Sequence, residues 1–200
     1  MPAEVPDQKP RLSTAELQEL LATVPCEPVD HPLLVVGVRG YYADKLGKPK
    51  KNDRNLYDDA IFVHTPFVTA SYNANTDPSS YRKGQGTAED TKGMASLKPG
   101  LWPVYRFGLH GKSKYFALCQ TGGKVTVVRD GEPDYEDTGY FGINIHRGGY
   151  NTTSSLGCQT IHPTQWDSFI SLVKDQAQRL RGADWKGASV TYALVERSFL

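Results

Sequence analysis

The sequence predicts a mainly β domain with one helix before the sheet and one helix late in it. Short apolar runs divided by turn residues fill most of the chain, as expected of strands joined by tight connections. Eleven tyrosines and nineteen glycines agree with many strands and turns. Two hundred residues fit one domain, with residues 1–30 as an arm and short helix and residues 31–200 as the main domain.

The first helix is predicted from its cap. Residues 1–12 are polar and rich in proline, which indicates a loose arm. Ser13 and Glu16 then have the spacing of a capping box, with Ser13 as the N-cap. Apolar residues follow at helical spacing (Leu17, Leu20 and Leu21), and Pro25 ends the helix.

The strands are predicted from apolar runs rich in β-branched and aromatic residues. Seven such runs are Leu33–Val38, Ala60–Val63, Phe67–Ser71, Val104–Phe107, Tyr115–Leu118, Lys124–Val128 and Gly142–His146. Between them, the run from Asn73 to Gly100 is rich in small polar residues and is expected to be a long exposed loop.

A second helix and a last strand complete the pattern. Pro163 suits the first turn of a helix, and the helical spacing of Trp166, Phe169, Ile170 and Val173 continues to about Leu180. Gly182 is the expected end of this helix. In Ala188–Val195, alternate residues are apolar and aromatic, which predicts a strand.

Charge and cysteine content exclude several classes of protein. The formal net charge of +1 provides no global field for binding nucleic acid. The longest apolar run, Pro32–Val38, is far shorter than the ~20 residues that cross a bilayer, so no membrane insertion is expected. The three cysteines cannot form a complete set of intramolecular disulfides. Asp53, Asp58 and Asp59 read as a turn cluster and lack histidines at zinc-ligand spacing, so we expect no metal and no cofactor.

The segment Gly139–Pro163 contains the residues best suited to chemistry. Strand alternation places Phe141, Ile143 and Ile145 toward the core, and therefore Asn144 and His146 on the other face. Cys158 follows His146 by twelve residues, with a glycine directly before it.

Cysteine and histidine together form a known type of nucleophile. A thiol with a pKa of ~8.5 is mostly protonated at neutral pH. A neighbouring imidazole can take the proton, form a thiolate–imidazolium pair, and later protonate a leaving amine. We therefore interpret Cys158 as a nucleophile and His146 as its base. Asn144, Gly148 and His110 are weaker candidates for contact with substrate.

The remaining histidines are weaker candidates still. His31 and His64 stand beside prolines at strand ends, where satisfying a turn is the simpler role. His162 leads directly into the second helix, where a polar role at the helix start is expected.

Two segments resemble the catalytic domains of the L,D-transpeptidase family (the YkuD type), which carry a histidine at a strand end and a downstream Ser/Thr-x-Gly-Cys. These segments are Ile145–Gly148 and Ser155–Cys158. An upstream run, Lys98–Pro103, is similar to the family's Pro-Gly-x-aromatic turn. The similarity covers about residues 93–165. It implies an L,D-transpeptidase-like β-sandwich or barrel, with a helix after the catalytic cysteine.

The resemblance also implies a role for each matching residue. Cys158 would be the nucleophile and His146 the base. The backbone carbonyl of Arg147 would orient the imidazole, and the amides of Gly157 and Cys158 would hold the oxyanion. Ser155 would brace the loop before the cysteine.

The chain departs from the family at three points. Leu156 stands where the family has histidine, and Gln159-Thr160 follow the cysteine where the family has an apolar residue and then Arg or Asn. The distance along the chain from His146 to Cys158 is also short. These departures concern recognition of the donor stem. They favour a divergent branch and hydrolysis over transfer.

The function expected from these observations is that of a cysteine peptidase or L,D-transpeptidase acting on stem peptides of bacterial peptidoglycan. The first thirty residues lack the basic and apolar regions of a secretory signal. We therefore expect synthesis in the cytoplasm and action on the cell wall, in the periplasm, after release or delivery. A bacteriophage lysis enzyme (an endolysin) or a delivered effector toxin fits this expectation.

Two alternatives remain open at this point. An NlpC/P60 or amidase-type hydrolase is disfavoured because such domains place the cysteine before the histidine in the chain. A non-catalytic cell-wall-binding or virion structural β-domain would keep the scaffold, while Cys158 merely packs in it.

Overall fold

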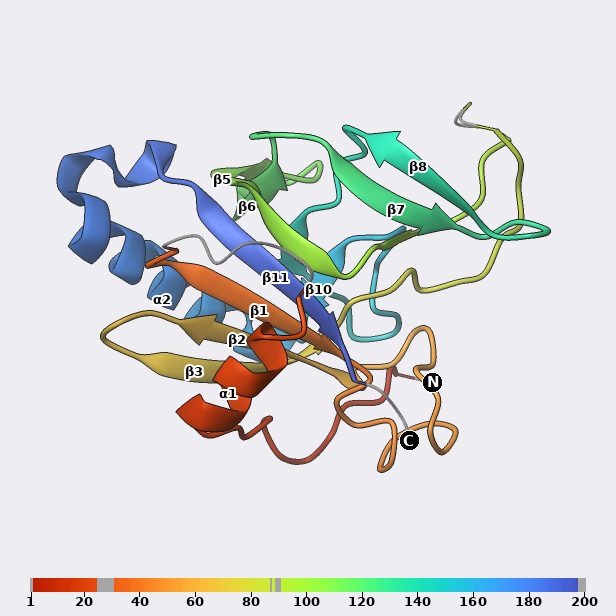
Figure 1. Cartoon of the computed structure of the whole chain (residues 1–200), viewed down its shortest axis with the longest axis horizontal. Helices are drawn as coiled ribbons and strands as arrows, with labels where there is room; N and C mark the ends of the chain where they lie inside the picture. Colours follow the sequence, from red (N-terminus) through yellow and green to blue (C-terminus); the bar gives the residue numbers. More distant parts are fainter. Residues whose placement is uncertain (1, 25–30, 87, 89–90, 198–200) are drawn as a thin grey trace.

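The computed structural model describes residues 2–24, 31–86, 88 and 91–197, and Cys26 and Pro25 lie outside this part. The described residues form two α-helices, α1 (Thr14–Leu21) and α2 (Pro163–Arg181), and a short 3-10 helix, η1 (Gly182–Gly187). The remaining elements are strands in two sheets (Figure 1). The predicted mainly β fold, with one N-terminal helix and one helix after Cys158, is confirmed.

The larger sheet closes into a barrel. Its strands are β1 (Leu34–Arg39), β2 (Asp59–His64), β3 (Thr69–Asn75), β5 (Gly100–His110), β6 (Tyr115–Gln120), β9 (Ile145–Arg147), β10 (Gln159–Ile161) and β11 (Val190–Glu196). They follow the order β1-β11-β5-β6-β9-β10-β3-β2. The pairs β1/β11 and β9/β10 are parallel, and the other neighbours are antiparallel.

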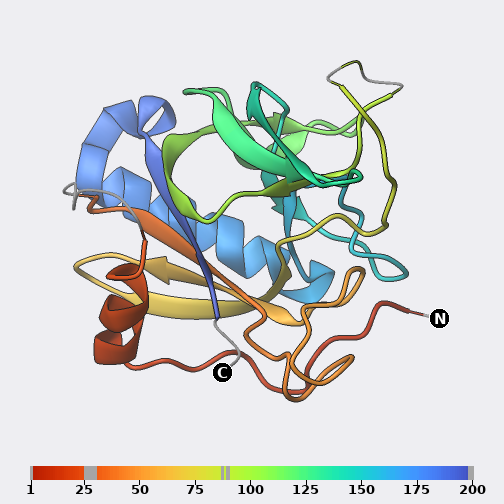
Figure 2. The same ribbon diagram turned by 45° about the vertical axis from the view of Figure 1, so that its right-hand side comes forward.

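A second sheet lies beside the barrel, at the upper right of Figure 1. It contains β4 (Ala95–Leu97), β7 (Val125–Arg129) and β8 (Tyr135–Gly139), in the order β4-β7-β8. In the turned view this sheet lies at the top, α1 lies at the lower left, and α2 runs from the left across the middle of the molecule (Figure 2).

Three strands were not predicted. β4 and β10 have three residues each, too few for a periodic pattern, and β8 is the polar run Tyr-Glu-Asp-Thr-Gly with no buried position. The long loop predicted from Asn73 to Gly100 is wrong in part, because β3 continues to Asn75 and β4 lies inside it. The predicted strand Phe67–Ser71 begins two residues later, at Thr69.

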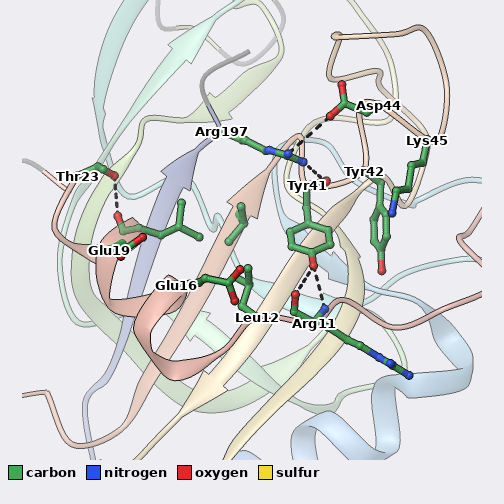
Figure 3. Close-up of a pocket in the computed structure, with 12 residues that line it drawn as sticks. Arg11, Leu12, Glu16, Glu19, Thr23, Tyr41, Tyr42, Asp44, Lys45 and Arg197 are labelled. Carbon is green, nitrogen blue, oxygen red and sulfur yellow. Dashed lines mark hydrogen bonds and ion pairs between the residues drawn. The ribbon is translucent and has the colours of Figure 1, made fainter. Parts of the chain in front are cut away.

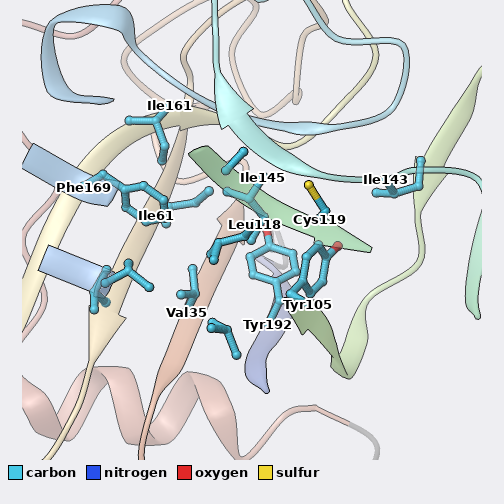
Figure 4. Close-up of a cluster of buried hydrophobic side chains, with 14 of the residues drawn as sticks. Val35, Ile61, Tyr105, Leu118, Cys119, Ile143, Ile145, Ile161, Phe169 and Tyr192 are labelled. Carbon is cyan, nitrogen blue, oxygen red and sulfur yellow. The ribbon is translucent and has the colours of Figure 1, made fainter. Parts of the chain in front are cut away.

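The strand predicted at Gly142–His146 begins instead at Ile145. The backbone amides of Phe141 and Ile143 donate to the side-chain oxygen of Gln120, at 3.2 and 3.0 Å, rather than to a neighbouring strand. The buried side chain of Gln120, and not backbone hydrogen bonds to a neighbouring strand, therefore holds the segment that leads into β9. Ile143 and Ile145 still face the core as predicted, and Ile145 lies beside Leu118 (Figure 4).

Both helices follow the sequence signals closely. Ser13 is the N-cap of α1, and the capping box with Glu16 is formed in both directions. α2 begins with Pro163 in its first turn, and Gly182 ends it with a φ of 57°. Glycine suits this position because side chains rarely adopt a positive φ.

The core has two parts, on the two faces of β1, β2 and β11. One cluster fills the barrel and includes Val35, Ile61 and Tyr192, together with the buried face of α2. A second cluster includes the intervening residues Val36 and Phe62, and Leu17 of α1 covers it. The strands therefore read as continuous apolar runs because helices or loops cover both faces.

The N-terminal arm is held against the barrel, which corrects the prediction of a loose arm for residues 2–12. The carbonyls of Pro6 and Pro10 accept hydrogen bonds from the side chains of Asn73 and Ser71, at 3.0 and 2.6 Å. Ala3 is buried, and its amide donates to the carbonyl of Tyr150 at 2.8 Å. Because the arm satisfies polar groups on β3, it forms part of the folded domain.

Helices long and apolar enough to cross a membrane are absent from the described residues.

Candidate active site

The parallel pairing of β9 and β10 brings the segments that contain His146 and Cys158 side by side. His146 lies opposite Thr160, and Ile145 lies opposite Gln159. Cys158 directly precedes β10, and its sulfur accepts from the backbone amide of Asn144, two residues before His146, at 3.4 Å.

The loop before Cys158 is braced from inside. The Ser155 hydroxyl donates to the carbonyl of Cys158 at 2.7 Å and accepts from the amide of Gly157 at 3.0 Å. Gly157 has a φ of 140°, and a β-carbon there would lie 2.4 Å from the carbonyl oxygen of Ala95. Only glycine fits this position, so the loop can present the thiol in one conformation. The expected bracing contact of Ser155 is present.

The Cys158 thiol is partly exposed and carries its proton. It donates to the carbonyl of Gly142 at 3.3 Å and accepts from the amide of Asn144 at 3.4 Å. Burial raises the pKa of Cys158 to about 11, although the hydrogen bond from Asn144 opposes this effect. In the described residues, no hydrogen bond joins the sulfur to the His146 ring. Both the direction of this shift and the contact with Gly142 favour the protonated thiol.

The His146 ring is buried and neutral near pH 7. Burial, together with a smaller effect of the nearby His110 ring, lowers the pKa of His146 to about 4, and the contact with Arg147 opposes the shift. Nδ1 of His146 lies 2.8 Å from the carbonyl oxygen of Arg147. A carbonyl only accepts, so Nδ1 carries the proton and Nε2 remains a base. This is the contact that the family resemblance implies for Arg147.

His110, at the end of β5, lies directly on His146. The two rings are stacked, with centroids 4.1 Å apart and an interplanar angle of 16°. Nδ1 of His110 is 3.0 Å from the side-chain nitrogen of Asn144. The tertiary structure thus brings together His110, Asn144, His146 and Cys158 from three separate segments.

Three predicted roles need correction. The amide of Gly157 already donates to Ser155, so it is not a free donor for an oxyanion. Gly148 does not offer a ligand close approach, because it is buried and a β-carbon there would lie 2.2 Å from the Tyr57 hydroxyl. The Asn144 side chain is engaged at both ends, by His110 and by the amide of Gln120, and therefore orients other groups instead of facing substrate.

Two residues of the site were not predicted. Gln120 is buried, and its side chain contacts four backbone groups of the segments 123–143: the amides of Phe141 and Ile143 and the carbonyls of Gly123 and Gly139. The one feature of the sequence that could have indicated this role is a glutamine at the end of an apolar strand. The Tyr115 hydroxyl lies 3.4 Å from Nδ1 of His146 and 3.5 Å from the carbonyl of Arg147.

The remaining histidines have local structural contacts, as predicted for His64 and His162. Nδ1 of His64 lies 2.9 Å from the Thr69 hydroxyl across a hairpin, and Nδ1 of His162 lies 2.8 Å from the Thr164 hydroxyl at the start of α2. Nδ1 of His31 lies 2.9 Å from the Thr191 hydroxyl. These rings serve turns and helix ends and are not gathered at Cys158.

The acidic cluster before β2 satisfies backbone groups. Asp59 accepts from the amides of Gly40 and Thr76, both at 2.6 Å, and Asp58 accepts from the amide of Asp53 at 3.0 Å. This arrangement agrees with a turn cluster. Within the described ranges, no group of three or more His, Cys, Asp or Glu residues has a geometry that could hold a metal ion.

An exposed apolar side chain stands near the thiol in the sequence, and a hollow lies elsewhere on the molecule. Leu156, two residues before Cys158, is 77% exposed. A hollow of about 600 Å³ lies between α1 and the segment after β1, where Arg197 donates to the carbonyl of Tyr41 at 3.0 Å (Figure 3). None of the candidate site residues lines this hollow.

Comparisons with family models, with curated proteins and with solved structures find no match for this chain.

Proposed function

We propose that this chain is a cysteine-dependent peptidase or transpeptidase that acts on the stem peptides of bacterial peptidoglycan. One observation carries the proposal: Cys158 directly precedes the strand that pairs in parallel with the His146 strand, its sulfur accepts from the amide of Asn144 at 3.4 Å, and Nδ1 of His146 is held by the Arg147 carbonyl at 2.8 Å. This contact leaves Nε2 of His146 unprotonated and able to act as a base. The substrate class rests on the resemblance of Ile145–Gly148 and Ser155–Cys158 to L,D-transpeptidases, as does an L,D-transpeptidase-like fold.

The reaction begins from a thiol and a neutral imidazole. As the sulfur of Cys158 attacks an amide carbonyl, its proton passes to Nε2 of His146, and a carbon–sulfur bond forms. The carbon–nitrogen bond then breaks, and the leaving amine takes the proton from Nε2. This step yields a thioester and a free amine.

A second nucleophile resolves the thioester. Water or an amine attacks the carbonyl, its proton passes to Nε2, and the carbon–sulfur bond breaks as the thiol is protonated again. Water gives hydrolysis, and an amine gives transfer. The exposed Leu156 next to the site is an apolar contact for the substrate where the family has a histidine.

A second candidate function is that of a non-catalytic β-domain that binds the cell wall or forms part of a virion. The observation that favours it is the state of the thiol, which burial keeps protonated with a pKa of about 11 and which donates to Gly142. A thiol with these properties also suits a residue that only packs.

The test is digestion of purified peptidoglycan, with the released muropeptides identified by mass. We expect wild type to shorten or exchange stem peptides, and Cys158→Ala and His146→Gln to lose this activity by ~10³-fold or more. Cys119→Ala is the matched control, because Cys119 is a buried core thiol on β6 (Figure 4). If wild type and Cys158→Ala give the same muropeptides, the enzyme proposal is wrong and the binding domain remains.

A further inference from the structure

We infer that His110 is a positioning residue for His146: its stacked ring, anchored by the Asn144 amide, keeps the His146 imidazole neutral and turned with Nε2 as the base. The inference rests on the proposed function for its catalytic meaning. Its geometry stands independently, on three contacts among described residues.

The first contact fixes the orientation of the Asn144 side chain. The backbone amide of Gln120 lies 2.8 Å from Oδ1 of Asn144. A backbone N–H can only donate, so this atom must be the amide oxygen. The other end of the side chain is therefore the NH₂ group, a donor.

The second contact fixes the proton of His110. The Asn144 NH₂ group lies 3.0 Å from Nδ1 of His110, so Nδ1 must accept and the neutral ring carries its proton on Nε2. Protonating His110 would place two donors against each other. Rotating the Asn144 amide would not relieve this, because it would break the bond with Gln120.

The third contact transmits this state to His146. The rings stack at 4.1 Å, and a positive charge on one ring would repel a positive charge on the other at this distance. Because the Asn144 contact opposes a charge on His110, the stack holds His146 flat against a neutral neighbour. The two histidines thus have opposite tautomers, with the proton on Nδ1 of His146 and on Nε2 of His110.

Other groups around His146 do not replace His110 in this role. Tyr115 of β6 contacts Nδ1 at 3.4 Å, and the guanidinium of Arg147 lies over the Tyr115 ring at 5.2 Å. Trp166 of α2, which is uncharged, packs against Tyr115. The Cys158 thiol is protonated in the resting state, as is Cys119, whose pKa burial raises. Among these groups, His110 is the one in ring-to-ring contact.

The test is nuclear magnetic resonance of the protein labelled with ¹⁵N-histidine, which reports the tautomer and the titration of each ring without a substrate. We expect wild-type His146 to carry its proton on Nδ1 and His110 on Nε2. In wild type, a proton taken up by His110 at low pH repels a second proton on the stacked His146 ring; the phenyl ring of His110→Phe cannot take up a proton, so the pKa of His146 should rise from about 4 by on the order of one unit.

Two further variants complete the test. His110→Gln offers an acceptor to Asn144 without the ring, so His146 should titrate higher, and its unstacked ring should no longer be held in the one orientation that places Nδ1 on the Arg147 carbonyl. His64→Phe, a strand-end histidine that contacts Thr69, should leave both properties of His146 unchanged. An Nδ1–H tautomer for His110, or an unmoved His146 titration in folded His110→Phe, would overturn the inference.

The outcome of this test does not depend on whether the proposed function is correct. If peptidoglycan is not a substrate, muropeptide release fails while the tautomers stay as expected. If the function holds and the tautomers differ, muropeptide release persists and only the role of His110 is lost.

Discussion

Gly157 precedes the candidate nucleophile with a φ of 140°, a backbone conformation that side chains rarely adopt. A methyl group at this position would also lie 2.4 Å from the carbonyl of Ala95 in the neighbouring sheet. We predict that Gly157→Ala lowers the free energy of unfolding by about 2 kcal/mol or more, because strain and overlap act together. Urea denaturation followed by circular dichroism measures this change.

The control for this prediction is Gly187→Ala. Gly187 lies at the end of η1, and a β-carbon there meets no atom within 4 Å. Its substitution should change the free energy of unfolding by less than about 1 kcal/mol. Equal midpoints for the two variants would mean that the loop before Cys158 tolerates a side chain and is not rigid.

Residue types alone were enough to single out His146 and Cys158, since a glycine-flanked thiol after a strand-end histidine is an unusual combination. They could not assign the protons. Burial raises the pKa of Cys158 to about 11, opposite to the direction expected from an imidazole partner, and Cys119 of β6 adds to the rise. The roles of Asn144 and Gly148 were wrong because long-range partners occupy them.

At the scale of elements, α1 shows how a short helix becomes part of the fold. Its eight residues are too few to be stable alone in water. Leu17 is fully buried against the outer face of β1, β2 and β11. We predict that Leu17→Ala lowers the free energy of unfolding by about 2–4 kcal/mol, because it leaves a cavity in this second cluster. Thermal or urea unfolding measures the loss.

Gln18→Ala provides the comparison on the same helix, because Gln18 is exposed and alanine favours helices. Its effect should stay within about 0.5 kcal/mol. A Leu17→Ala variant as stable as Gln18→Ala would show that α1 does not unfold together with the barrel.

Apolar runs in the sequence predicted most of the strands, whereas the residues at which a strand begins and ends depend on its backbone partners. β5 extends from Gly100 to His110, well beyond the predicted Val104–Phe107, because β6 and β11 supply backbone partners along its length. β10 has three residues and no periodic signal, and it exists because β3 and β9 flank it. The parallel pairing on which the candidate site depends could therefore not be predicted from any local pattern in the sequence.

At the scale of the whole molecule, buried ionisable groups make stability depend on pH in opposite directions. Burial lowers the pKa of His146 to about 4, so the unfolded chain binds a proton between about pH 6.5 and 4 that the folded protein does not bind. Stability from this residue therefore falls as the pH falls. Burial and neighbouring carboxylates raise the pKa of Asp58 and Asp59, so their contribution falls as the pH rises above about 4.

Comparison of wild type with His146→Gln isolates one of these effects. We predict that the stability advantage of wild type shrinks by about 3 kcal/mol as the pH falls from about 6.5 to about 4. The contributions of Asp58 and Asp59 are common to both proteins and cancel in the difference. The free energy of unfolding, measured in urea at a series of pH values, gives this difference. A difference that does not vary with pH would mean that His146 titrates alike in the folded and unfolded chains.

The sequence by itself determined the fold class, the positions and caps of both helices, and the pair of residues best suited to chemistry. These features depend on local spacing, which a single segment contains. The tertiary structure decided the closure of the barrel, the pairing of β9 with β10, and the protonation of Cys158 and His146. Proton positions depend on burial and on the atoms that face each group, and only the folded chain brings His110 onto His146.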